Sequence, residues 1–218
     1  MPEIDKSDDD PGANAPLSIT RQASRQPDKS RRIAFPGSFN PPTVGHLAMA
    51  EAALAATAAV GADLIVSRVA LGKEALERPT LAHRLDVLFD VAATRPWLDV
   101  VVTDARLLAD IAEGYGWLLI GGDKWTQINE LRWYDDSASL RLASLARLPP
   151  LIVVGRDDHA VPDDAIEIRV PEALGISSTG VRAGNWKAAT KEARDFALRT
   201  GAWIDHARYE RHLDRERS

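Results

Sequence analysis

The chain has 218 residues, of which 45% are hydrophobic and 27% are charged, and its formal net charge is −5. This composition is typical of one globular domain with its own core. The acidic balance argues against non-specific binding to nucleic acid or to an anionic membrane, because proteins of those classes are usually basic. The absence of cysteine excludes disulfides, cysteine-ligated zinc, iron–sulfur clusters and a thiol nucleophile.

The first thirty residues form a separate region of the sequence. Residues 1–30 are rich in Asp, Ser, Pro and Gln and show no periodic apolar pattern, which predicts a disordered tail ahead of one domain at 31–218. The N-terminus lacks the apolar core of a signal peptide, and the most apolar long run, 47–60, is too short to span a bilayer. We therefore expect a cytoplasmic protein with no membrane and no nucleic acid among its partners.

From residue 31 onward, short apolar runs alternate with helical patterns. Runs rich in Val, Ile and Leu predict strands at 32–36, 63–70, 98–103, 117–121, 150–155 and 165–170. Apolar residues at helical spacing predict helices at 44–60, 80–94, 105–113, 137–147, 187–200 and 202–215. This alternation predicts an α/β fold, a Rossmann-like open, doubly wound parallel sheet with helices on both faces and a short helical C-terminal part at about 176–218.

Such sheets bind ligands at the carboxyl ends of their strands, near the point where the strand order reverses. Three glycine-containing segments follow predicted strands, and we expect them to converge at one edge of the sheet. They are Gly37, Gly121-Gly122-Asp123 and Gly155-Arg156.

The first of these segments belongs to a stretch, 32–46, that reads as strand, glycine turn and helix N-terminus. An apolar run ends at Gly37, a stiff Asn-Pro-Pro turn follows, and Thr43 occupies the N-cap position of the next helix. The unpaired backbone N–H groups and positive dipole of such a turn suit a phosphate group. His46 falls in the first turn of that helix and is expected to point to the same place.

A second stretch, 176–182, reads Ile-Ser-Ser-Thr-Gly-Val-Arg. Its hydroxyl groups precede a short helical pattern, and Arg182 follows about one turn later. Hydroxyls and an arginine in this arrangement can hold phosphate oxygens, although alone they are better explained as a helix cap with a solvated arginine. The presence of the first stretch upstream shifts the balance toward phosphate binding.

Together the two stretches resemble the motifs of the nucleotidyltransferase superfamily, Thr/His-x-Gly-His early in the chain and Ile-Ser-Ser-Thr-x-x-Arg late. They stand here as Thr43-Val44-Gly45-His46 and as 176–182, and the resemblance covers roughly residues 31–210. Within the superfamily the chain is most similar to nicotinate or nicotinamide mononucleotide adenylyltransferases, through Leu119-Ile120-Gly121-Gly122-Asp123 and Trp133-Tyr134.

The resemblance implies an enzyme of NAD biosynthesis. Such an enzyme transfers AMP from ATP to the phosphate of nicotinate or nicotinamide mononucleotide, forms a dinucleotide and releases pyrophosphate. Its partners would be ATP, with Mg2+ arriving on the triphosphate, and a phosphorylated small-molecule acceptor. Assembly into a homo-oligomer is compatible with the sequence.

The resemblance also assigns roles to individual residues. The catalytic residues would be His46, Thr43, Lys73 and Arg182. The ATP-binding residues would be Gly37, Ser38, Phe39, Gly45, His46, Gly121, Asp123, Ile176, Ser177, Ser178, Thr179 and Arg182. The acceptor-binding residues would be Asn40, Lys73 and Trp133. We expect no protein metal site, because His83, His159, His206 and His212 have no ligand partner at useful spacing.

Two segments depart from the adenylyltransferase pattern. They bear on which acceptor substrate is bound more than on the nucleotidyl-transfer reaction itself. Residues 102–108 replace the Thr-x-Asp-Thr-Leu segment that helps to hold nicotinate, and Leu71-Gly72-Lys73 replaces a Pro-His-Lys loop. Three alternatives therefore stay open. They are a pantetheine-phosphate adenylyltransferase, a cytidylyltransferase of the same superfamily, and a non-catalytic nucleotide-binding protein.

Overall fold

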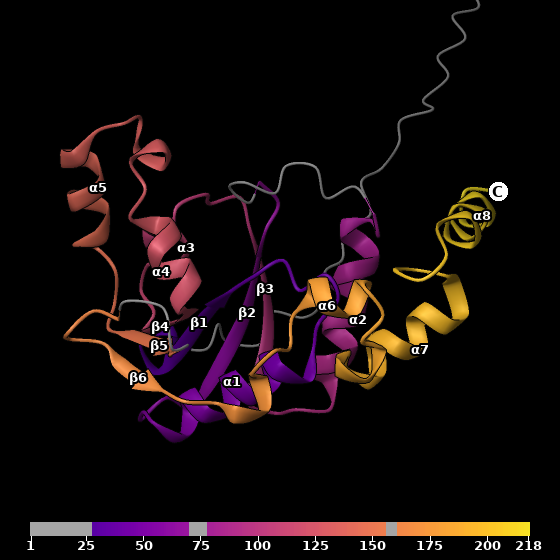
Figure 1. Ribbon diagram of the computed structural model, residues 1–218, viewed down its shortest axis with the longest axis horizontal. Helices are drawn as coiled ribbons and strands as arrows, with labels where there is room; N and C mark the ends of the chain where they lie inside the picture. Colours follow the sequence, from indigo (N-terminus) through magenta and orange to yellow (C-terminus); the bar gives the residue numbers. More distant parts are fainter. Residues whose placement is uncertain (1–27, 70–77, 156–160) are drawn as a thin grey trace, which may run out of the picture.

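The structure is a computed structural model that describes residues 28–69, 78–155 and 161–218 (Figure 1). Most of the expected tail, 1–27, and the segment that contains Lys73 lie outside these residues. Within them, one six-stranded parallel sheet has the order β3-β2-β1-β4-β5-β6. The strands are β1 (Arg32–Pro36), β2 (Gly61–Ser67), β3 (Leu98–Thr103), β4 (Trp117–Gly121), β5 (Leu151–Val154) and β6 (Ile166–Ile168).

This sheet confirms the predicted Rossmann-like α/β fold. Each predicted strand is present, and the strand order reverses between β1 and β4. In doubly wound sheets this reversal opens a crevice at the carboxyl ends of the two central strands, which is where such folds bind ligands.

Helices connect the strands and cover both faces of the sheet (Figure 1). The α-helices are α1 (Val44–Ala55), α2 (Leu81–Ala93), α3 (Leu108–Ile111), α4 (Gly122–Ile128), α5 (Ala138–Leu145), α6 (Ser178–Arg182), α7 (Lys191–Thr200) and α8 (His206–Glu216). Short 3-10 turns occur at η1 (Lys29–Arg31), η2 (Leu131–Tyr134), η3 (Pro171–Ala173) and η4 (Trp186–Ala188). None of the helices in the described part of the chain combines the length and apolar character needed to cross a bilayer.

Several predicted helices are shorter in the structure, and one helix was not predicted. The helix expected to reach residue 60 ends at Ala55, because the backbone N–H of Val60 already donates to Arg31 as the chain enters β2. The helix expected at 105–113 is reduced to α3, since Ala105 is held in a turn by hydrogen bonds with Ser67 and Thr103. The missed helix, α4, is seven residues long and begins with glycine, so it lacks a helical sequence pattern.

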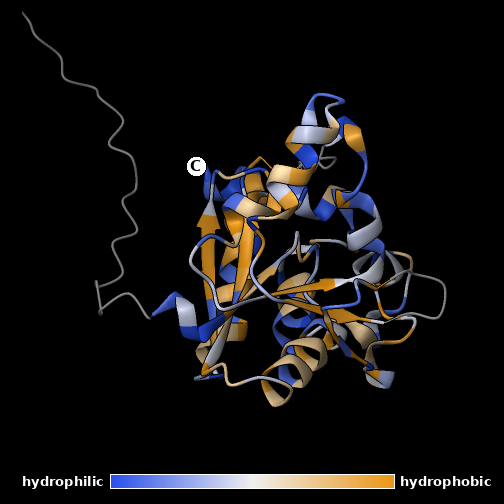
Figure 2. Ribbon diagram, turned by 90° about the vertical axis from the view of Figure 1, so that its left-hand side faces the viewer, coloured by the Kyte–Doolittle hydropathy of each residue, from blue (hydrophilic) through white to orange (hydrophobic). Residues whose placement is uncertain are grey.

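The core follows from the alternation of side chains along each strand. Ile33 and Phe35 of β1 pack on the face covered by α1 and α2, whereas Ala34 between them faces α3. Figure 2 shows the strands as the most hydrophobic part of the molecule. This double-sided burial explains why the strands are continuous apolar runs.

A third apolar cluster attaches the C-terminal helices to the outside of α2. Leu88 and Val91 of α2 face the sheet, while Val87 packs against Val181, Phe196 and other residues of α6, α7 and α8. In Figure 1, α7 and α8 accordingly lie beside α2, away from the sheet. Helix α2 is thus sandwiched between the sheet and the C-terminal part.

A buried ion pair joins the neighbouring strands β1 and β2 near their amino ends. Arg32 of β1 donates to Asp63 of β2, with 2.8 Å between Arg32 Nε and Asp63 Oδ1. The hydroxyl of Tyr115 donates to the other carboxylate oxygen at 2.8 Å. All three residues are less than 10% exposed, and burial together with the Asp63 charge raises the pKa of Tyr115 far above its ordinary value.

Candidate functional site

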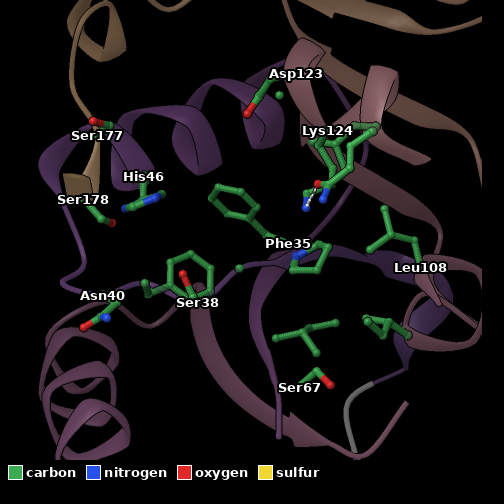
Figure 3. A pocket seen from close by; sticks show the side chains of 18 of the residues that line it. Phe35, Ser38, Asn40, His46, Ser67, Leu108, Asp123, Lys124, Ser177 and Ser178 are labelled. Carbon is green, nitrogen blue, oxygen red and sulfur yellow. Dashed lines mark hydrogen bonds between the residues drawn. The ribbon is translucent and has the colours of Figure 1, made fainter. Parts of the chain in front are cut away.

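A cavity of about 780 Å³ opens at the carboxyl ends of the central strands (Figure 3). Phe35 and Pro36 at the end of β1, Ser67 at the end of β2 and Gly121 at the end of β4 line it. Its remaining walls come from residues 37–40, from the start of α1, from parts of 106–134 and from 176–182. The cavity therefore occupies the crevice where the strand order reverses.

The predicted site residues meet in this cavity. Each of the twelve expected ATP-binding residues lines it, as do Thr43, Asn40 and Trp133. Lys73 and Arg156 lie outside the described residues. Gly155 follows β5 at the same carboxyl edge of the sheet, next to Gly121 of β4, as expected, but it does not line the cavity.

Thr43 and His46 form a reciprocal cap at the start of α1. The backbone N–H of His46 donates to Thr43 Oγ1 at 3.2 Å, and the backbone N–H of Thr43 donates to His46 Nδ1 at 3.0 Å. Because a backbone N–H can only donate, Nδ1 must carry a lone pair, and the proton of the neutral imidazole is on Nε2. The local fold thus selects the histidine tautomer.

Aromatic packing completes the placement of the His46 ring. The Phe39 ring contacts it edge-on with 5.1 Å between ring centroids, and the Phe35 ring lies at 6.1 Å. Phe39 is almost fully buried although its backbone has a φ of 44°. A non-glycine residue held in the left-handed region costs about 1–3 kcal/mol, which burial of the phenyl ring offsets.

The two motif stretches touch each other directly. Gly45 allows this approach, because a Cβ at this position would lie 3.0 Å from Ile176 Cγ2. The hydroxyl of Ser178 donates to the carbonyl of Pro41 at 2.8 Å, and the Arg182 guanidinium donates to the carbonyl of Asn40. The residues that the sequence suggested as phosphate ligands therefore also hold the turn that precedes α1.

We refer to residues 37–43 as the phosphate turn. Two further side chains support it from outside the motifs: Arg84 of α2 donates to the carbonyl of Ser38 at 3.2 Å, and the Trp203 indole N–H donates to the Asn40 side chain. Asn40 is 2% exposed, so its amide helps to order the turn from a buried position.

Sequence reasoning missed Arg84. Burial lowers the pKa of its guanidinium, and its Nε lacks a hydrogen-bond partner within the described residues. An arginine in a helical pattern is ordinarily solvated, so only tertiary packing identifies this one.

The wall of the cavity formed by α4 carries Asp123 and Lys124. Asp123 lies in the first turn of α4, whose N-cap position is occupied by Gly121. Its exposed carboxylate lines the cavity. Figure 3 shows Asp123 and Lys124 across the cavity from His46, Ser177 and Ser178.

The cavity is positively charged although the whole chain is acidic. Arg106, Lys124 and Arg182 line it, and Asp123 is the single carboxylate among the lining residues that the structure describes. Arg106 and Lys124 were not predicted, because isolated basic residues in loops and short helices resemble solvated surface residues. Such a lining favours an anionic ligand.

Trp133, expected near the acceptor, is half-buried at the edge of the cavity. Its indole N–H donates to the carbonyl of Gln127 at 2.9 Å, and the Arg132 guanidinium stacks over the ring at 4.4 Å from the centroid. The ring is thus held at a defined angle beside the cavity.

The structure corrects the expectation that the histidines have no neighbour able to share a metal ion with them. The fold brings His83 and His212 close together, with ring centroids 5.5 Å apart, and Glu216 lies against both of them. The sequence contains one indication of this cluster: His212 and Glu216 are four residues apart on one helix, which places them on the same face. His206 is exposed, and His159 lies outside the described residues.

Comparisons with known proteins agree with this geometry. Two solved structures of the nicotinic acid mononucleotide adenylyltransferase of Plasmodium falciparum, one complexed with APC and one with NaAD, superpose with TM-scores of 0.59 and 0.61. Sequence identity is 12% and 13%, and each alignment covers 81% of this chain and 98% of the other. At this identity the likeness demonstrates a shared fold. No curated protein sequence matches the chain significantly.

A protein-family model shows which family the chain belongs to, which the low pairwise identities do not. The cytidylyltransferase-like model matches residues 34–184, a span that begins in β1 and ends just after Arg182. The match includes both motif stretches and the strands that place them at one cavity. The chain therefore belongs to the cytidylyltransferase-like family.

Proposed function

We propose that this protein is an adenylyltransferase that joins ATP to a pyridine mononucleotide, nicotinate or nicotinamide mononucleotide, with release of pyrophosphate. The observation that carries the proposal is the meeting of the Thr43–His46 cap with Ser178 and Arg182 in one positively charged cavity. An oxygen of the acceptor phosphate attacks the α-phosphorus of ATP. The bond to the bridging oxygen breaks, and pyrophosphate leaves with the electron pair.

This reaction needs positioning and charge stabilisation more than covalent help from the protein. His46 supplies a donor to an α-phosphate oxygen through Nε2–H, because Thr43 holds Nδ1 as an acceptor. Negative charge on that oxygen grows in the transition state, so a fixed donor stabilises the transition state more than the bound substrate.

Arg182 and the nearby hydroxyls are suited to the β- and γ-phosphates. The Arg182 guanidinium lines the cavity while donating to Asn40 and to Thr179 Oγ1, so its position is set by the protein before a ligand arrives. Lys73, which the resemblance also assigns to the phosphates, remains part of the proposal from sequence alone.

Mg2+ would accompany ATP as part of the substrate. Asp123 is the one carboxylate in the described lining, which is too few for an all-protein magnesium site. The ion would therefore be held mainly by phosphate oxygens and water, as Mg2+ usually is with nucleotides. Its charge would offset the negative charge of the triphosphate.

The acceptor would occupy the side of the cavity near Trp133, Arg106 and Lys124. An aromatic ring held by Gln127 offers a stacking surface for a pyridine, and the two cations suit the acceptor phosphate or a nicotinate carboxylate. The related fold of an enzyme that acts on nicotinic acid mononucleotide supports this choice. The family description keeps CTP as an alternative donor.

A pyrophosphate-release assay with defined substrate pairs tests the proposal. Each of ATP and CTP is paired with nicotinate mononucleotide, nicotinamide mononucleotide or phosphopantetheine, and the nucleotide product is identified by mass spectrometry. We expect turnover with ATP and a pyridine mononucleotide. Turnover only with CTP or only with phosphopantetheine would replace the proposal, and ATP binding without turnover would indicate a non-catalytic protein.

The residue assignment is tested with His46→Ala. Loss of one transition-state donor should lower kcat by about 100- to 1,000-fold. The cap should survive, because Thr43 Oγ1 can still accept from the backbone N–H of residue 46. His206→Ala, at an exposed position on α8, is the matched control. Wild-type kcat in His46→Ala would refute the role of His46.

A further inference from the structure

Two histidines and a glutamate meet where α8 packs against α2, on the opposite side of α2 from the sheet. His83 Nε2 lies 3.0 Å from Glu216 Oε2, and His212 Nε2 lies 3.2 Å from Glu216 Oε1. The ligand atoms of all three residues lie within 4.8 Å of one another. No role in the adenylyl transfer proposed above involves this cluster.

These distances are close to those required by a tetrahedral zinc ion. Bonds of about 2.0–2.1 Å to nitrogen and oxygen place neighbouring ligand atoms of a tetrahedron roughly 3.3 Å apart. The two nitrogen–oxygen distances are near this value, although each is to a different oxygen of the Glu216 carboxylate. With all the ligand atoms within 4.8 Å of one another, the three side chains are close enough to share one ion. Two imidazoles and one carboxylate form a donor set that suits zinc, with water as the fourth ligand.

The surroundings of His83 also fit a metal ligand. Its Nδ1 lies 2.7 Å from the hydroxyl of Tyr209, which accepts from the backbone N–H of Thr80 at 3.0 Å. With metal on Nε2, the Nδ1–H would donate to that hydroxyl, whose own proton can turn to Thr80 Oγ1, 3.5 Å away. Such outer hydrogen bonds orient metal-binding histidines and select the tautomer that leaves Nε2 able to bind.

Access and charge agree with this assignment. The Glu216 side chain is 46% exposed and that of His212 is 23% exposed, whereas that of His83 is 10% exposed, so the cluster has an open outer side and a fixed inner side. Asp86 lies three residues after His83 on α2, which places a second carboxylate on the same side of that helix. A divalent cation can therefore enter from solvent and is favoured at this position.

We propose that His83, His212 and Glu216 bind one Zn2+ ion that fastens α8 to α2. The ion would replace the two close contacts between the imidazoles and the Glu216 carboxylate and would add bonds between helices that are far apart in the sequence. Because Arg84, the neighbour of His83, holds the phosphate turn, the ion would stabilise the helix that supports the candidate active site.

Calorimetric titration of the EDTA-treated full chain with ZnCl2, in buffer without nucleotide, tests the proposal. We expect one Zn2+ per chain and a higher melting temperature in its presence, because an ion that binds only the folded state stabilises it. His212→Gln and Glu216→Gln should each lower the affinity by more than tenfold, whereas His206→Gln, also on α8, should not. Co2+ in place of Zn2+ should give the visible absorption of a tetrahedral site.

Tyr209→Phe isolates the positioning hydrogen bond. It keeps the buried ring and should reduce Zn2+ affinity by about 10- to 100-fold, the usual effect of losing such a partner. Absence of stoichiometric binding to the wild-type chain would overturn the proposal, leaving the cluster as a contact between one carboxylate and two imidazoles. Unchanged affinity in both His212→Gln and Glu216→Gln would also overturn it, because the ion would then bind elsewhere.

Discussion

Replacing Gly45 with alanine should push apart the two motif stretches that form the candidate active site. The added Cβ would lie 3.0 Å from Ile176 Cγ2 and 3.2 Å from Ile176 Cβ, whereas ordinary contacts begin at 3.4 Å. The neighbouring segment must therefore retreat by about 0.4 Å. That movement separates His46 from Ser178 and Arg182.

The substitution should lower both the rate of catalysis and the stability. A misplacement of 1 Å can cost about 100-fold in rate, so 0.4 Å should lower kcat by roughly sixfold. Overpacking costs about 1–3 kcal/mol, but alanine is favoured over glycine in a helix by about 1 kcal/mol. The free energy of unfolding should therefore fall by no more than about 2 kcal/mol.

Steady-state kinetics of pyrophosphate release and urea unfolding of the same preparations measure both effects. Gly180→Ala is the matched control, because its Cβ would meet only Ser177 Oγ, at an ordinary 3.4 Å. Adding Ile176→Ala to Gly45→Ala removes the clashing Cγ2 and should restore part of the lost kcat. A wild-type kcat in Gly45→Ala, or no recovery in the double variant, would refute the reasoning.

Three further substitutions probe other parts of the molecule. Gly121→Ala would place a Cβ 2.6 Å from Asp123 Oδ1 and displace that carboxylate, so the KM for ATP should rise several-fold in steady-state assays with little change in melting temperature. Asp63→Leu leaves Arg32 buried without its partner and should lower the unfolding free energy by about 3–5 kcal/mol in urea titrations, while kcat per folded molecule stays unchanged. Arg84→Met removes a buried guanidinium whose Nε is unsatisfied, so the melting temperature should stay the same or rise. The same change removes a hydrogen-bond donor from the phosphate turn, so kcat should fall in the steady-state assay.

The fold was largely predictable because its signals are local. Continuous apolar strands and helical periodicity identified the six strands and the main helices, and Thr43 before a helical pattern marked the start of α1. The errors fell where tertiary contacts override local preference. Val60 leaves the helical pattern for a hydrogen bond to Arg31, and α4 forms after a glycine N-cap because it continues directly from β4.

The candidate site was predictable only where residues belong to a recognisable motif. The spacing within 43–46 and within 176–182 places those side chains on helix starts, and the parallel sheet brings them to one edge. Arg106 and Lys124 carry no such pattern, so their presence in the cavity depends on how a loop and a short helix pack. Trp133 was expected near the acceptor, but its angle is set by the carbonyl of Gln127.

The sequence by itself determined the sheet, the helix caps and the motif residues, since strand alternation and N-capping depend on neighbours a few positions away. Only the tertiary structure decided which distant residues meet. Arg84 reaches the phosphate turn, Gly45 admits Ile176, and His83 approaches His212, all across more than 40 positions of chain. Such contacts arise from the packing of whole helices against the sheet and against one another, and no local pattern encodes them.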